Sequence, residues 1–156
     1  MKKLSVLFSI FAVLMAVTFT SCDQSSKMEP LTEDMIGEWM IGTWDVEIVG
    51  KTVVAGVEAE AKTQGLYEIK GIEDDSDVIS TTIISGVETS ATVKFSFVKD
   101  LLFSAKNSSI ETEDVKMEYS LEVNKPRTKI VANTSSKVEV LGKTTETVST
   151  STWTKR

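Results

Sequence analysis

Alternation of apolar and polar residues is the feature that most limits what this chain can fold into. It is clearest over residues 115–123, where the apolar positions are Val115, Met117, Tyr119, Leu121 and Val123 and the positions between them are Lys116, Glu118, Ser120 and Glu122. A repeat of two residues puts successive side chains on opposite faces of a β-strand. We therefore predict a strand here, with one face in a core and the other in solvent.

Similar alternation recurs along most of the chain. The further predicted strands cover residues 44–48, 55–69, 78–84, 87–97, 101–105, 130–132, 138–141 and 145–154. The predicted turns are Gly50-Lys51, the acidic run 73–77 and residues 107–109, and Pro126 ends the strand before it. No long helix interrupts the pattern, so parallel strands joined by helical crossovers are not expected. The predicted fold class is all-β: an antiparallel up-and-down meander of about eight to ten strands that closes into a barrel, because open edges invite aggregation.

A short helix is predicted before the first long strand. Thr32 is a candidate N-cap, and the two acidic residues after it favour a helix N-terminus. The apolar residues that follow are spaced like one helical face: Met35, Ile36, Trp39 and Met40. We expect this helix to cover residues 33–40 and to end near Gly42.

The N-terminal residues have the pattern of an export signal. Lys2 and Lys3 precede an apolar run over residues 4–17, which is shorter than the ~20 residues that span a bilayer. Residues 19–22 (Phe-Thr-Ser-Cys) resemble the lipobox of bacterial lipoproteins, although Phe19 replaces the usual leucine. The resemblance implies cleavage before Cys22, the only cysteine, and acylation of its thiol. An ordinary secreted protein is the alternative.

These signals divide the chain into three parts. Residues 1–21 are predicted to be a lipoprotein signal peptide, residues 22–31 the lipidated cysteine with a polar tether, and residues 32–156 the barrel domain. The predicted location is the cell envelope, lipid-anchored, with the outer membrane favoured. The side of the membrane that the domain faces and its oligomeric state stay open.

Composition argues against several classes of function. The formal net charge is −6, and an acidic chain repels nucleic-acid phosphates. The chain has no histidine, which is the commonest general base and zinc ligand, and acylation would remove the only thiol. The acidic run 73–77 lacks the spacing of a calcium loop and is predicted to be a solvated turn. We expect no catalysis, no cofactor and no metal.

Gly42-Thr43-Trp44 opens the first long strand and resembles the Gly-x-Trp signature of the lipocalin and lipocalin-like families. Those are up-and-down β-barrels that bind small, mostly apolar molecules. The resemblance implies that Gly42 and Trp44 lie at the closed end of a barrel, where a basic residue of the last strand, Lys155 or Arg156, covers the indole. The layout from about residue 33 onward is similar to small lipocalin-like lipoproteins of Bacteroidetes-type bacteria. The second motif of true lipocalins and a disulfide are both absent.

The residues predicted to line a cavity in such a barrel are Phe95, Phe97, Phe103, Met117, Tyr119 and Leu121. In a filled barrel the same residues would pack on one another. Five alanines on presumed inward faces favour some internal space, namely Ala55, Ala59, Ala61, Ala91 and Ala105.

The first functional hypothesis is a membrane-anchored module that binds a small apolar or amphipathic ligand. The second is a structural or protein-interaction lipoprotein with a filled barrel. A carboxylate-dependent hydrolase is the third, and the alternation argues against it because it puts Glu118 and Glu122 on the outer face.

Overall fold

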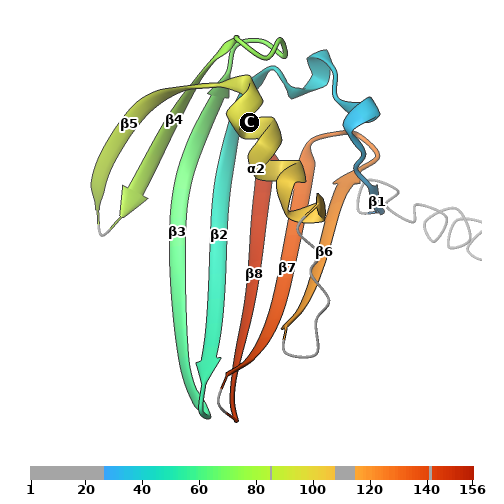
Figure 1. The fold of residues 1–156 in the computed structure, drawn as a ribbon. Coiled ribbons are helices and arrows are strands. Elements are labelled where there is room, and N and C mark those ends of the chain that lie inside the picture. Colours follow the sequence, from blue (N-terminus) through green and yellow to red (C-terminus); the bar gives the residue numbers. More distant parts are fainter. Residues whose placement is uncertain (1–26, 85, 108–114, 141) are drawn as a thin grey trace, which may run out of the picture.

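The computed structural model describes residues 27–84, 86–107, 115–140 and 142–156. The predicted signal peptide and Cys22 lie outside the described residues. The chain forms one eight-stranded antiparallel sheet with the order β1-β6-β7-β8-β2-β3-β4-β5 (Figure 1). The strands are β1 (Met28–Pro30), β2 (Gly42–Val54), β3 (Val57–Ile69), β4 (Asp77–Ile84), β5 (Val87–Lys94), β6 (Val115–Asn124), β7 (Lys129–Val140) and β8 (Lys143–Lys155).

The predicted antiparallel meander is confirmed, but several strands are longer than expected. Gly50-Lys51, predicted to be a turn, lies inside the 13-residue β2. The chain reverses instead at Ala55 and Gly56, whose φ angles of 50° and 82° are both positive, as a type I′ hairpin turn requires. The alternation over residues 115–123 is confirmed as β6. Part of the predicted tether also joins the sheet, because β1 pairs with the end of β6.

The sheet is not closed within the described residues. β5 is paired with β4, and β6 with β7 and, over three residues, with β1. Successive antiparallel pairings from β5 round to β6 leave these two strands running in the same direction. The other edge strand, β1, pairs with β6 over only three residues, and the helix α2 (Phe95–Asn107) lies between β5 and β6 (Figure 1).

The prediction that residues 95–97 and 101–105 are strands is wrong, because they belong to α2. Phe95 and Phe97 are two residues apart and fit a strand. The side chains that are buried, however, are Phe95, Val98 and Leu102, which have helical spacing. The predicted helix over residues 33–40 is also wrong. Two 3₁₀ turns, η2 (Glu33–Met35) and η3 (Glu38–Met40), replace it, and the Thr32 side chain makes no capping hydrogen bond.

The core is at one end of the sheet, on the face that α2 covers. We call this face the inner face, the opposite one the outer face, and the end that carries the core the core end. The buried core residues are Leu31, Met40, Trp44, Val46, Ile69, Val78, Phe95, Val98, Leu102, Phe103, Leu121, Val123, Ile130 and Trp153. All of these core residues lie between Leu31 and Trp153 in the sequence. A chain of residues 23–156 therefore contains the whole described core.

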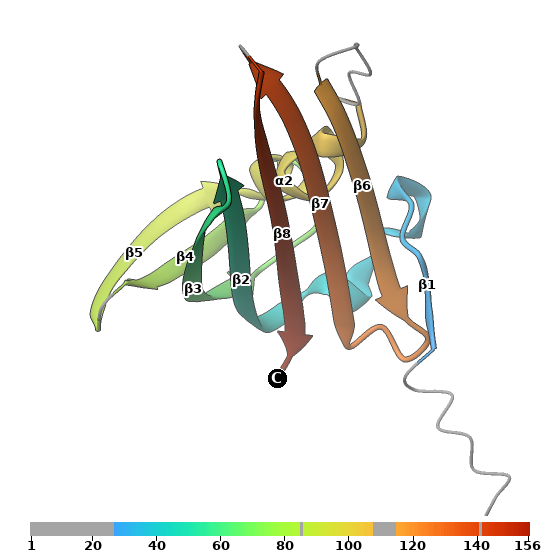
Figure 2. The same cartoon turned by 90° about the horizontal axis from the view of Figure 1, so that it is seen from below.

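The other end of the sheet, which we call the hairpin end, includes the β2–β3 and β4–β5 turns. From below, β4 and β5 swing away from β6, β7 and β8 (Figure 2). We call the part of the inner face beyond the core the trough. Gly65 permits close approach of β4 to β3. A Cβ added there would lie 2.6 Å from the Thr81 carbonyl oxygen.

Candidate functional site

The strand register separates the charged side chains from one face of the sheet. Paired residues in neighbouring strands share a face, so the pairs of Trp44 with Tyr67 and of Val46 with Trp153 define the inner face. From β2 to β8, charged residues occupy inner-face positions only at the two ends of β8, at Lys143 and Lys155. The inner face is therefore uncharged over most of its length.

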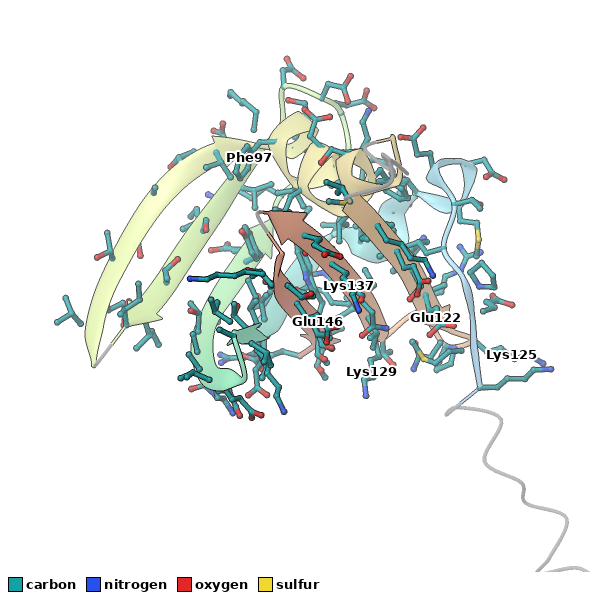
Figure 3. All side chains as sticks on the ribbon, turned by 60° about the horizontal axis from the view of Figure 1, so that its bottom comes forward. Phe97, Glu122, Lys125, Lys129, Lys137 and Glu146 are labelled. Carbon is teal, nitrogen blue, oxygen red and sulfur yellow. The ribbon has the colours of Figure 1, made fainter. Side chains whose placement is uncertain are left out.

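The outer face carries the charged residues of the same strands. Many are paired across strands, as in Lys51–Glu58 at 2.8 Å, Lys62–Glu47 at 2.7 Å, Lys94–Asp77 at 2.6 Å and Lys137–Glu146 at 2.9 Å. Figure 3 labels four outer-face residues of β6, β7 and β8, namely Glu122, Lys129, Lys137 and Glu146. Exposed ion pairs add little to stability. Their main effect is to make this face hydrophilic, in contrast to the inner face.

Apolar side chains are exposed on the inner face at the hairpin end. The exposed fractions are 48% for Val54, 73% for Val57, 62% for Ile84 and 67% for Val87. Between them and the core the inner face carries small and hydroxyl side chains, including Thr52, Ala59, Ala61, Thr82, Thr134, Ser136, Thr147, Ser149 and Ser151. Val54 and Val57 flank the β2–β3 turn, and Ile84 and Val87 flank the β4–β5 turn, so the exposed apolar side chains form two separate pairs. Exposed apolar side chains of this kind mark candidate binding surfaces.

Two stacked aromatic rings separate the filled core end from this uncovered surface. Tyr67 and Trp153 stack with their ring centroids 4.9 Å apart and an interplanar angle of 4°. The Trp153 indole nitrogen donates to the Ser151 hydroxyl at 2.9 Å. Trp153 is buried and Tyr67 is half-buried, so this pair marks the edge of the core on the side of the hairpin end.

Three of the residues predicted to line a cavity lie on the inner face of β6. Leu121 is buried, whereas Met117 and Tyr119 are half-buried. The Tyr119 hydroxyl donates to the Leu102 carbonyl of α2, and burial raises the pKa of Tyr119. These contacts fix α2 across the inner face.

The three predicted phenylalanines lie on α2, in different environments. Phe95 and Phe103 are buried in the core. Phe97 is 52% exposed at the N-terminal end of the helix beside β5 (Figure 3), and Leu101, one turn later, is 48% exposed. Phe97 is thus the most exposed of the three, while Phe103 lines a hollow of about 250 Å³ together with Tyr119 and Leu121.

Trp44 has a basic residue over its ring, as the Gly-x-Trp resemblance implies, although it lies at the core end of an open sheet and not at the closed end of a barrel. It is fully buried, and its indole nitrogen donates to the Met40 carbonyl at 2.7 Å. The Lys155 ammonium lies 5.7 Å from the ring centroid and donates to the Trp39 carbonyl at 2.5 Å. Gly42 has a φ of 126°, and a Cβ there would come within 3.3 Å of the Lys155 side chain.

Arg156 does not lie over Trp44, because successive residues of a strand face opposite ways. Its guanidinium binds the Asp45 carboxylate on the outer face, with Nε to Oδ2 at 2.9 Å and Nη2 to Oδ1 at 2.7 Å. This pairing holds the pKa of Asp45 below its usual range. Of the two predicted basic residues, Lys155 is the one that covers the indole.

The outer face has a hollow of about 530 Å³ beside this ion pair. Its wall includes Asp45 and Arg156, which bind each other, and Glu47, which accepts from Gln64 at 3.1 Å and pairs with Lys62. Hydrogen bonds from Lys62 and Gln64 lower the pKa of Glu47. The charged groups of the hollow are thus engaged with one another, which makes it a poorer candidate for a ligand than the inner face.

The acidic run 73–77 is a turn whose carboxylates pair with nearby lysines. Asp74 lies 2.6 Å from the Lys99 ammonium and Asp77 lies 2.6 Å from that of Lys94. The described residues contain no group of three or more histidine, cysteine or acidic side chains that could hold a metal ion. Within the same ranges, no helix is long and apolar enough to cross a membrane.

Sequence reasoning missed the hydroxyl-rich inner face of β8. The sequence carries a signal for this face, because every second residue from 145 to 151 has a hydroxyl group. These residues are Thr145, Thr147, Ser149 and Ser151. Comparison of the chain with protein-family models, curated proteins and solved structures found no match.

Proposed function

We propose that this chain is a membrane-anchored lipoprotein of the cell envelope that binds a small apolar or amphipathic ligand. The sheet would act as an open form of a lipocalin-like barrel, with the inner face as the binding surface. The observation that carries the proposal is the separation of charge: the outer face is charged, whereas the uncovered part of the inner face carries a single charged residue, Lys143 at the start of β8, and exposes valine and isoleucine.

Binding would be driven by removal of apolar surface from water. A ligand chain on the inner face would cover one of the two apolar pairs, Val54 with Val57 or Ile84 with Val87, which lie six residues apart along β3. Each Å² of apolar surface covered contributes roughly 25 cal/mol before the costs of association. Phe97 of α2 would add an aromatic contact beside β5. The serine and threonine hydroxyls would bind the polar atoms of the ligand. Acylated Cys22 would hold the domain at the membrane.

A second candidate is a protein-interaction lipoprotein without a small ligand. It is favoured by the core end of the inner face, which protein side chains fill, and by the edge of β5, which has no strand partner beyond β4 within the described ranges. An exposed edge can accept an extended segment of a partner through backbone hydrogen bonds.

Native mass spectrometry of residues 23–156, purified gently from bacterial cells, separates the two candidates. The binding proposal predicts an added mass that is released on denaturation. Thr147→Trp, which would fill the inner face, should abolish the added mass. Glu146→Trp places the same side chain on the outer face and should leave it unchanged. A clean mass after incubation with envelope lipid extract would contradict the proposal and favour a protein partner.

A further inference from the structure

We infer that two copies of this chain pair through the free edge of β5 and form one continuous sheet. The inference goes beyond the proposed function and does not depend on it. Within the described ranges, β5 pairs with β4 on one side and with no strand on the other. The backbone N–H and C=O groups along that side are therefore available to another strand.

The two sides of the sheet differ in how well they can accept another strand. On the β6 side, Leu31 and β1 bond to residues 121–124, so a strand that ran along β6 would collide with this segment. By contrast, β5 (VETSATVK) has 8 residues, contains no proline, and is exposed from Val87 to Thr92. The edge of β5 is therefore the better place for a partner strand.

The outer-face side chains of β5 carry opposite charges near its two ends. Glu88 is the second residue of the strand and Lys94 is its last, and both are exposed. A two-fold axis through Ala91 pairs Glu88 of each copy with Lys94 of the other, because both residues are equally far from Ala91 along the strand. The strand is thus complementary to a second copy of itself in antiparallel register.

Other registers lose this match. A shift by one residue would put inner-face side chains opposite outer-face side chains. A shift by two residues moves the axis to Ser90 or to Thr92, which sets Glu88 opposite Thr92 or beyond the end of the strand. The Ala91 register keeps both inner faces on one side of the joined sheet and joins opposite charges.

The ion pair inside each copy is compatible with this contact. Lys94 lies 2.6 Å from Asp77 of β4, which is opposite it across the β4–β5 pairing. In the joined sheet, Lys94 lies between Asp77 of its own chain and Glu88 of the other chain. A cation between two carboxylates gives a row of alternating charges on the outer face. Lys94 therefore does not protect the edge as an isolated lysine would.

The same register covers exposed apolar side chains. Because the two strands run antiparallel, the hairpin end of one β5 meets the core end of the other. Val87, which is exposed, then comes opposite Phe95 of the other copy, the first residue of α2. Phe97 is exposed beside the same end of β5 (Figure 3). Pairing therefore brings together two apolar side chains that face water in a single copy.

Analytical ultracentrifugation of residues 23–156 tests the inference, and without Cys22 no disulfide can link two chains. The wild type should form a dimer whose population rises with concentration. Glu88→Lys and Lys94→Glu each set like charges opposite each other twice, and each should weaken the dimer at least about tenfold. Glu139→Lys makes the same charge change as Glu88→Lys on the outer face of β7 and should leave the dimer unchanged.

Mixing the two β5 variants separates a charge contact from a loss of folding. In a mixed dimer both contacts again join opposite charges, so the mixture should dimerise at concentrations where neither variant does so alone. If Lys94→Glu does not fold by circular dichroism, Asp77→Lys combined with Lys94→Glu keeps the ion pair within the copy and gives the same test.

Three results would overturn the inference. One is a wild type that stays monomeric up to about 1 mM. Another is a dimer that the β5 variants weaken no more than Glu139→Lys does. The third is a mixture of the two β5 variants that does not dimerise.

Discussion

A methyl group added at Gly65 should destabilise the trough. The added Cβ would lie 2.6 Å from the Thr81 carbonyl oxygen, whereas ordinary contacts begin at 3.4 Å. The backbone of β4 would have to withdraw from β3 by roughly 0.8 Å, because interiors are close-packed and have little spare volume. Overpacking of this kind costs about 1–3 kcal/mol. For a chain of this length, Gly65→Ala should lower the melting temperature by roughly 4–12 °C.

Gly50→Ala is the matched control. Gly50 lies on the inner face of β2, and the nearest atom to its added Cβ is the Ala61 carbonyl oxygen at 4.0 Å. Without a clash, this substitution should stabilise the fold by about 0.4–1 kcal/mol, because it restricts the unfolded chain. Thermal and urea denaturation of both variants of residues 23–156 would measure the difference. A Gly65→Ala variant as stable as Gly50→Ala would refute the close approach of β4 to β3.

Three further predictions concern the anchor, the helix and the acid stability. Cys22→Ser should abolish incorporation of a labelled fatty acid in bacteria and release the chain from the membrane-anchored pool; continued labelling would contradict the lipobox assignment. Tyr119→Phe, which removes the hydrogen bond to Leu102, should cost about 1 kcal/mol and speed amide exchange in α2, and unchanged exchange would argue against this contact. The pKa of Asp45 is lowered by Arg156, so the pairing stabilises the fold above the unfolded pKa of about 3.9 and is lost as the pH falls through the folded value. Asp45→Asn should therefore melt below the wild type at pH 7 and together with it in strong acid; equal melting at pH 7 would contradict a stabilising pair.

The strands could be predicted from the sequence where one face is buried and the other charged. The alternation over residues 115–123 gave β6 correctly, because Leu121 and Val123 pack in the core while Glu118 and Glu122 face outward. At the hairpin end this contrast is weak, since Ala59 and Ala61 are exposed on the inner face. The turn was predicted at Gly50-Lys51, whereas the chain reverses at Ala55 and Gly56.

Residues 95–107 could not be assigned from local pattern alone. Phe95 and Phe97 fit a strand, while Phe95, Val98 and Leu102 fit a helix, and short apolar runs leave this ambiguity. In three dimensions the burial of Phe95, Val98 and Leu102 decides for the helix α2, which lies between β5 and β6 in the chain. The separation of charged residues to the outer face, with only Lys143 and Lys155 on the inner face of β2 to β8, depends on the register of seven strands, which no single segment encodes.

The most direct test of the central claim is to find where a neutral alkyl ligand attaches. Residues 23–156 would be irradiated with a decanol analogue that carries a diazirine in its chain, and the labelled residues mapped by mass spectrometry. The binding account predicts labels on inner-face residues such as Val57, Ile84 and Thr147, and on Phe97 of α2. Labels on their outer-face neighbours Glu58, Ile83 and Glu146, or labels that free decanol does not compete away, would contradict it.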